Sequence, residues 1–109
     1  MEIRGTGIDM VDMDRLVGRD VARMAEYICT ADELRRMELS RSAEQYVASR
    51  LALKEAVIKA SPERLFYHDI EIRTEGGKLS ASVAGSRNTF VVSLSHELRY
   101  CIAQALCLY

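Results

Sequence analysis

The chain has 109 residues, of which 49% are hydrophobic and 28% are charged, and its net charge is −1. These values are typical of one globular domain and exclude a disordered tail, a coiled coil or a collagen-like repeat. The balanced charge gives no overall basic field to attract nucleic acid, and no apolar run approaches the roughly 20 residues that a membrane span needs.

The N-terminal segment is predicted to be a strand. The first residues, MEIRGTGIDM, place an acid at position 2 and lack a long apolar segment, so we expect no secretory signal and a cytoplasmic location. Residues 2–12 alternate weakly between apolar and polar, which favours a strand. Gly5 and Gly7 within it would let another backbone come close.

Helical segments follow in the first half of the chain. Apolar residues at helical intervals predict a helix within residues 13–28. The sequence TADE is a helix N-cap with its acid three residues on, so a short helix is predicted over 31–39. A broad apolar stripe predicts a long helix over 43–60, and Pro62 ends it because the residue before a proline is biased away from helical angles.

In the second half of the chain, apolar and polar residues follow the two-residue alternation of strands. Strands are predicted at 69–74, 78–84, 90–95 and 100–109, with EGGK and AGSRN as turns. The order of strand, helices and strand meander predicts an α+β fold, in which an antiparallel sheet packs on a long helix and shorter helices. No repeat or linker divides the chain, so we expect one domain over residues 1–109.

The three cysteines are Cys29, Cys101 and Cys107. Their odd number and wide spacing fit neither a disulfide framework nor a zinc site. Cys29 and Cys101 lie among apolar residues and are predicted to be small core side chains.

Four polar residues are candidates for chemistry, and each has a structural alternative. Asp9 lies in the apolar stretch GIDMV, as either a solvent-facing acid or a cation ligand or general base. Glu55 and Lys59 are one helical turn apart, which suits a solvated ion pair as well as a charged substrate. His96 ends a strand, as either a satisfied turn histidine or a side chain presented to a ligand.

Taken together, these residues suit phosphate chemistry. Arg50 and Lys54 add cations around the polar side of the long helix. A hard divalent cation takes oxygen ligands from one or two carboxylates, substrate phosphates and water, while protein cations hold the remaining charge. The segment GRDVAR lacks the glycine spacing and lysine of a Walker loop, so side chains and a metal would hold a nucleotide-like ligand.

Four motifs in the same order carry a family resemblance: GIDMVDMDRL, RLALKEAVIKA, DIEI and SLSHELRYCIAQAL. Over nearly the whole chain, they resemble the holo-acyl-carrier-protein synthase family, the small trimeric type of 4′-phosphopantetheinyl transferase. The resemblance implies Mg²⁺-dependent transfer of phosphopantetheine from coenzyme A to a serine of apo-acyl carrier protein. Adenosine 3′,5′-bisphosphate would be released.

The resemblance also implies roles for individual residues. It makes Asp9 and Glu55 metal ligands, and it makes both of them catalytic together with Lys59. The implied coenzyme A contacts are Lys59, His96, Arg50 and Ser95, and the implied carrier-protein contacts are Arg15, Arg19 and Arg23.

A chain of this size is expected to form a homotrimer with sites between subunits, in which VVSL and CIAQALCLY help to bury the interface. His96 could then come from the same subunit as Asp9 or from a neighbour. The chain departs from the family after the long helix, where SPERLFYH replaces a longer, glycine-rich segment. Two other hypotheses therefore stay open: a catalytically weak relative that binds coenzyme A or a carrier protein without turnover, and a purely structural subunit.

Overall fold

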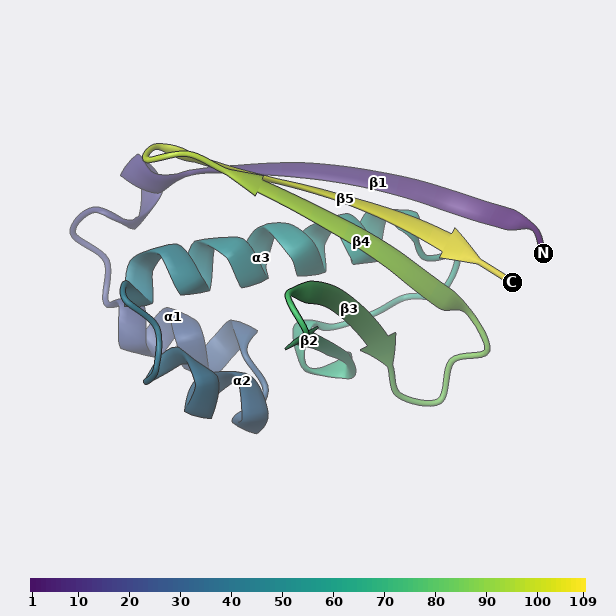
Figure 1. Ribbon diagram of the computed structural model, residues 1–109, viewed down its shortest axis with the longest axis horizontal. Coiled ribbons are helices and arrows are strands. Elements are labelled where there is room, and N and C mark those ends of the chain that lie inside the picture. Colours follow the sequence, from purple (N-terminus) through teal and green to yellow (C-terminus); the bar gives the residue numbers. More distant parts are fainter.

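The computed structural model describes residues 1–109 as an antiparallel sheet with helices against one of its faces (Figure 1). This arrangement confirms the predicted α+β class. The sheet has five strands in the order β1-β5-β4-β3-β2, so the N-terminal strand forms one edge and pairs with the C-terminal strand. The strands are β1 (Ile3–Asp12), β2 (Ile70–Glu75), β3 (Lys78–Val83), β4 (Thr89–His96) and β5 (Tyr100–Leu108), and the α-helices are α1 (Val21–Ile28), α2 (Ala31–Met37) and α3 (Ala43–Ala60).

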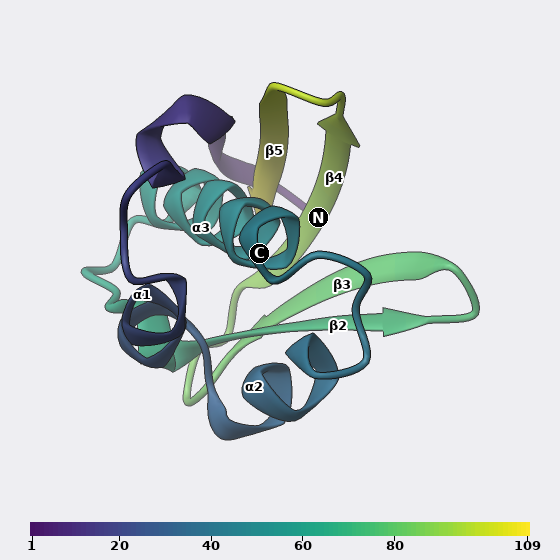
Figure 2. The same ribbon diagram turned by 90° about the vertical axis from the view of Figure 1, so that its left-hand side faces the viewer.

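The long helix α3 lies at the centre of the molecule, with β1, β5 and β4 on one side and α1 and α2 on another (Figures 1 and 2). It is therefore buried on several sides, whereas the sequence predicted a single apolar stripe. Its buried alanines repeat at intervals of four residues, which lets the helix approach its neighbours closely. These alanines are Ala48, Ala52, Ala56 and Ala60, all part of the main hydrophobic core.

The close approach of β1 to α3 depends on two glycines. A Cβ atom at Gly5 would overlap the carbonyl oxygen of Ala60, and one at Gly7 would overlap that of Ala56. The prediction that these glycines admit another backbone is thus confirmed, and the backbone is that of α3.

The predicted helix within residues 13–28 is wrong in its extent. The structure has a short 3-10 helix η1 (Met13–Leu16), then a turn, and then α1. Gly18 adopts a left-handed φ of 76° in the turn, which a helix cannot contain. Asp20 then begins α1, because its side chain accepts a hydrogen bond from the backbone N–H of Arg23 at 3.2 Å.

The other elements lie close to their predicted positions. The long helix spans Ala43–Ala60 as expected, and the four later strands differ from prediction by at most one residue at each end. All three cysteines are free and buried, which confirms the core role predicted for Cys29 and Cys101. Burial raises the pKa of the Cys29 thiol to about 11, so it stays protonated at neutral pH. None of the helices is both long and apolar enough to cross a membrane.

Replacement of Gly7 by alanine should destabilise the fold, since the new methyl group would meet the backbone of α3 and not a movable side chain. We expect Gly7→Ala to lower the free energy of unfolding by about 1–3 kcal/mol in urea denaturation. Ser80→Ala, at an exposed position of β3, is the control and should change it by less than about 0.5 kcal/mol. Equal effects of the two substitutions would contradict the close approach.

Candidate functional site

The carboxylate of Asp9 lies on the helix-facing side of β1 and contacts the ammonium of Lys59. Gly7 and Val11 on the same side are buried, whereas Ile8 on the opposite side is exposed. Lys59 Nζ donates to Asp9 Oδ1 at 3.1 Å and to the backbone carbonyl oxygen of Ile8 at 2.9 Å. The side chain of Asp9 is 19% exposed and that of Lys59 is 51% exposed, so the acid is partly shielded while its cation can reach a ligand.

Glu55 lies one turn before Lys59 on α3 but bonds to a different residue. The phenol of Tyr67, in the 3-10 helix η2 (Tyr67–Asp69), donates to Glu55 Oε1. Burial, followed by the contact with Glu55, raises the pKa of Tyr67, so the phenol keeps its proton and donates. Glu55 and Lys59 therefore do not form the solvated helix ion pair that their spacing allowed.

Asp9 and Glu55 carry the carboxylate oxygens that a hard divalent cation takes as ligands. Only one oxygen of each carboxylate forms a hydrogen bond, and the second oxygen of each is left for another ligand. No group of three or more His, Cys, Asp and Glu side chains in the structure could hold a metal ion. Two carboxylates without further protein ligands suit Mg²⁺, which keeps several waters and takes substrate phosphates as its other ligands.

A second polar site surrounds Arg50 on another side of α3. Its guanidinium carbon lies 4.2 Å from the centre of the Tyr46 ring, and Nη1 donates to Ser49 Oγ at 3.0 Å. Arg50 is only 8% exposed, and its Nε has no hydrogen-bond partner. A buried guanidinium with a spare donor favours an anionic ligand.

This second site opens into a cavity of about 200 Å³ that we call the Arg50 cavity. His96 stands at its edge, and its Nδ1 lies 2.8 Å from Nε2 of Gln45, which can only donate. Ser95 is exposed on β4 and does not line the cavity. The lining residues are Ser40, Arg41, Ser42, Gln45, Tyr46, Ser49, Arg50, Leu94 and His96.

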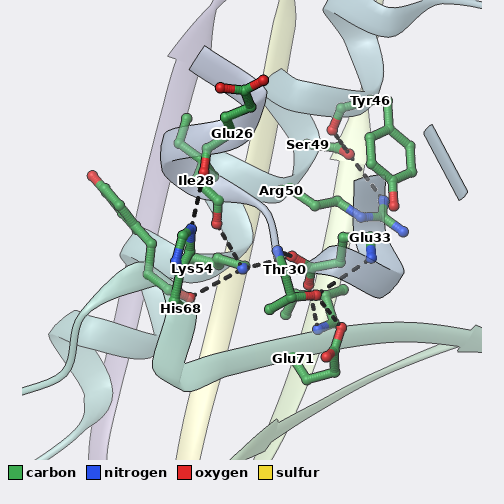
Figure 3. A network of polar contacts seen from close by, with 12 residues as sticks. Glu26, Ile28, Thr30, Glu33, Tyr46, Ser49, Arg50, Lys54, His68 and Glu71 are labelled. Carbon is green, nitrogen blue, oxygen red and sulfur yellow. Dashed lines mark hydrogen bonds and ion pairs between the residues drawn. The ribbon is translucent and has the colours of Figure 1, made fainter. Parts of the chain in front are cut away.

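Lys54 is fully buried, so the expectation that it faces the polar side of the helix is wrong, as it is for Arg50. Its ammonium donates to Glu33 Oε1 at 2.6 Å and to the carbonyl oxygens of Ile28 at 2.8 Å and Tyr67 at 3.0 Å. Glu33 in turn accepts from the backbone N–H of Ile72 at 2.7 Å. Figure 3 shows Lys54 and Glu33 within this network of polar contacts. A buried charge needs such partners, and this network joins α2 and α3 to the end of α1, to Tyr67 and to β2.

The three arginines implied as carrier-protein contacts are all exposed. Arg15 lies in η1, Arg19 in the turn after it, and Arg23 in the first turn of α1. Arg19 and Arg23 line a hollow of about 350 Å³, and none of the three arginines forms an ion pair within the chain. Their charges are therefore free for an acidic partner.

Sequence reasoning missed two residues beside the acids. Tyr67 gives no motif signal, because it lies in the irregular segment before β2. Glu33 was predicted only as the acid of the TADE cap, and it does fill that role by accepting from the backbone N–H of Thr30 at 2.8 Å. Its second role, as the partner of Lys54, depends on a contact 21 residues away and could not be predicted from local sequence.

Comparison with known proteins finds similar sequences over nearly the whole chain. The family model of the 4′-phosphopantetheinyl transferase superfamily matches residues 5–105. A holo-[acyl-carrier-protein] synthase of Geobacter sulfurreducens is 33% identical over 93% of this chain and 94% of its own length. That of Halalkalibacterium halodurans is 36% identical over 95% of this chain and 94% of its own length.

A solved structure shares the fold over nearly the full length. It is a holo-(acyl-carrier-protein) synthase from Bacillus anthracis in complex with CoA (3′,5′-ADP), with a TM-score of 0.87 and 27% identity over 96% of each chain. The chain thus belongs to the 4′-phosphopantetheinyl transferase superfamily, as the four motifs indicated.

Loss of the Lys54 ammonium should be costly, because Glu33 would remain buried without a counter-charge. We expect Lys54→Met to lower the free energy of unfolding by about 3–5 kcal/mol in urea denaturation. Lys59→Met removes a half-exposed ammonium from the same helix and should cost less than about 1 kcal/mol. Similar losses from both substitutions would contradict the structural role assigned to Lys54.

Proposed function

We propose that the protein is a holo-acyl-carrier-protein synthase, which transfers 4′-phosphopantetheine from coenzyme A to a serine of an apo-acyl carrier protein. The transfer depends on Mg²⁺ and releases adenosine 3′,5′-bisphosphate. The observation that carries the proposal is the position of Asp9, Glu55 and Lys59. The accessible ammonium of Lys59 on α3 bonds to Asp9 on β1, and Glu55 lies one turn before Lys59 on the same helix. Each of the two carboxylates keeps one oxygen without a hydrogen bond. The full-length similarity to holo-acyl-carrier-protein synthases supports this reaction.

The chemistry is the attack of a serine hydroxyl on the β-phosphorus of coenzyme A. A new oxygen–phosphorus bond forms to the serine, and the bond from phosphorus to the departing adenosine 3′,5′-bisphosphate breaks. Asp9 and Glu55 would hold Mg²⁺, which would supply charge neutralisation and orientation of the diphosphate. Lys59 holds further negative charge of the phosphates, because its ammonium can turn from Asp9 toward a ligand. Glu55 is our candidate for the group that accepts the hydroxyl proton.

The Arg50 cavity is proposed to bind a remaining phosphate of coenzyme A. Arg50 supplies a buried charge and an unused Nε donor, and His96 stands at the cavity edge. Arg50 and Lys59 are about two and a half helical turns apart, so they project from opposite sides of α3. A site that uses both groups on one ligand is therefore best completed by two copies of the chain, with Arg50 and His96 from a neighbouring subunit.

The outer face of the sheet supports a homotrimer built in this way. Large apolar side chains there are exposed, with exposed fractions of 63% for Ile8, 54% for Met10, 50% for Val91 and 41% for Ile102. They lie on the adjacent strands β1, β5 and β4, so they form one apolar surface that has no partner within the chain. The predicted interface segments VVSL and CIAQALCLY include Val91 and Ile102.

Arg15, Arg19 and Arg23 are proposed to dock the acidic carrier protein. Their free positive charges complement negative charge on a partner and would steer its approach. A catalytically weak binder of coenzyme A is the second candidate function, because SPERLFYH departs from the family pattern beside Glu55.

Mass spectrometry of an apo-acyl carrier protein, incubated with coenzyme A and Mg²⁺, separates the two candidates. We expect a mass gain of one phosphopantetheine that EDTA abolishes. Asp9→Asn and Glu55→Gln should each lower kcat by about 100-fold or more, since each removes a charged ligand of the metal. Glu75→Gln, at the exposed end of β2, is the control and should leave kcat unchanged. Coenzyme A binding without a mass gain on several carrier proteins would support the weak binder.

Mixed assemblies test whether the sites lie between subunits. Glu55→Gln and Arg50→Met should each be inactive alone, and each should remain trimeric in light scattering. When the two variants are co-expressed in equal amounts, roughly a quarter of the sites would combine an intact Glu55 with an intact Arg50 from the next chain. Activity should rise to about that fraction, whereas sites within single chains would give no recovery.

A further inference from the structure

The segment between α3 and β2 places one neutral donor against the candidate metal ligand Glu55. Tyr67 donates its phenol proton to Glu55 Oε1, and no other side chain bonds to this carboxylate. Lys59, one helical turn after Glu55, is directed to Asp9 and the carbonyl of Ile8. His68, the neighbour of Tyr67, bonds through Nε2 to the carbonyl oxygen of Glu26 at 3.0 Å. Tyr67 is therefore the only protein group that orients Glu55.

Tyr67 is itself held at two points. Its backbone carbonyl accepts a hydrogen bond from the buried ammonium of Lys54 at 3.0 Å. Its ring packs edge-on against the ring of Tyr27, with centroids 5.7 Å apart and planes at 72°. The adjacent residues Lys54 and Glu55 thus contact opposite ends of Tyr67, one at the backbone and one at the phenol. A donor fixed in this way can fix its acceptor.

Glu55 otherwise faces open space. It lines a hollow of about 420 Å³ together with Tyr27, Ile58, Leu65, Phe66, Tyr67 and His68, of which most are apolar. A glutamate beside such a hollow has several rotamers available, and binding of a cation would have to select one of them. The phenol removes this freedom before a ligand arrives, and it leaves Oε2 available.

We propose that Tyr67 is a positioning residue, which holds the Glu55 carboxylate in the orientation that binds a divalent cation and is fixed for this purpose by Lys54. The inference rests on the proposed function for the role of the cation, but it concerns a contact within this chain. Groups that orient metal ligands commonly change metal affinity or activity by about 10- to 100-fold when they are removed.

The test measures Mn²⁺ affinity, from the electron paramagnetic resonance signal of free Mn²⁺, in the presence of saturating coenzyme A. Tyr67→Phe keeps the ring and the backbone carbonyl and removes only the phenol. We expect its Mn²⁺ dissociation constant to rise by about 10-fold or more. Tyr27→Phe removes the other phenol of the aromatic pair, which does not contact Glu55, and should leave Mn²⁺ affinity unchanged. An unchanged or tighter dissociation constant for Tyr67→Phe, or no Mn²⁺ binding by the wild type, would overturn the inference.

Two further measurements, of unfolding and of carrier-protein modification, distinguish this inference from a structural role for Tyr67 and from the proposed function itself. A merely structural role for Tyr67 would lower the unfolding midpoint of the metal-free protein without changing Mn²⁺ affinity, and that result overturns positioning. A wild type that modifies the carrier protein while Tyr67→Phe binds Mn²⁺ equally well overturns the inference and keeps the proposed function. A wild type that binds Mn²⁺ more tightly than Tyr67→Phe but modifies no carrier protein keeps the inference and overturns the proposed function.

Discussion

The buried pair of Lys54 and Glu33 is the contact on which the rest of the architecture depends. Its two side chains bond to the end of α1, the start of α2, the segment before β2 and β2 itself. Together with α3, which carries Lys54, five segments meet at one charge pair. Removal of two charges from water is unfavourable, and only this complete set of partners offsets that cost. The same pair holds the backbone of Tyr67, which links a core contact to the orientation of Glu55.

Local sequence signals predicted most of the fold and only part of the site. The long helix and the strands followed from periodicity, caps and turn residues, which act over a few positions. The helix expected within residues 13–28 failed because Gly18 allows a left-handed turn that the apolar spacing did not reveal. Lys54 was predicted on the polar side of the long helix, whereas Glu33, a partner 21 residues away, makes its burial possible.

Some features of the candidate site could be predicted from sequence motifs, and others follow only from the tertiary structure. Asp9, Glu55, Lys59 and Arg50 were predicted as site residues from the sequence, and the structure brings Asp9 to Lys59 between β1 and α3. It also separates Arg50 from that group by half the circumference of α3, a division that a linear motif does not express. Tyr67 belongs to no motif, because its role depends on the tertiary contact between its phenol and Glu55.

The glycines of β1 have an effect beyond packing. Two residues along a strand advance about 6.7 Å, and four residues along a helix advance about 6.0 Å. Because these spacings are similar, Gly5 lies against Ala60 and Gly7 lies against Ala56. A shift of β1 by one residue would bring a side chain into contact with the helix carbonyls. The close approach therefore fixes the register of β1 relative to α3. Asp9 is the next residue on that side. Gly5 and Gly7 therefore determine where the Asp9 carboxylate lies, although neither glycine takes part in the chemistry.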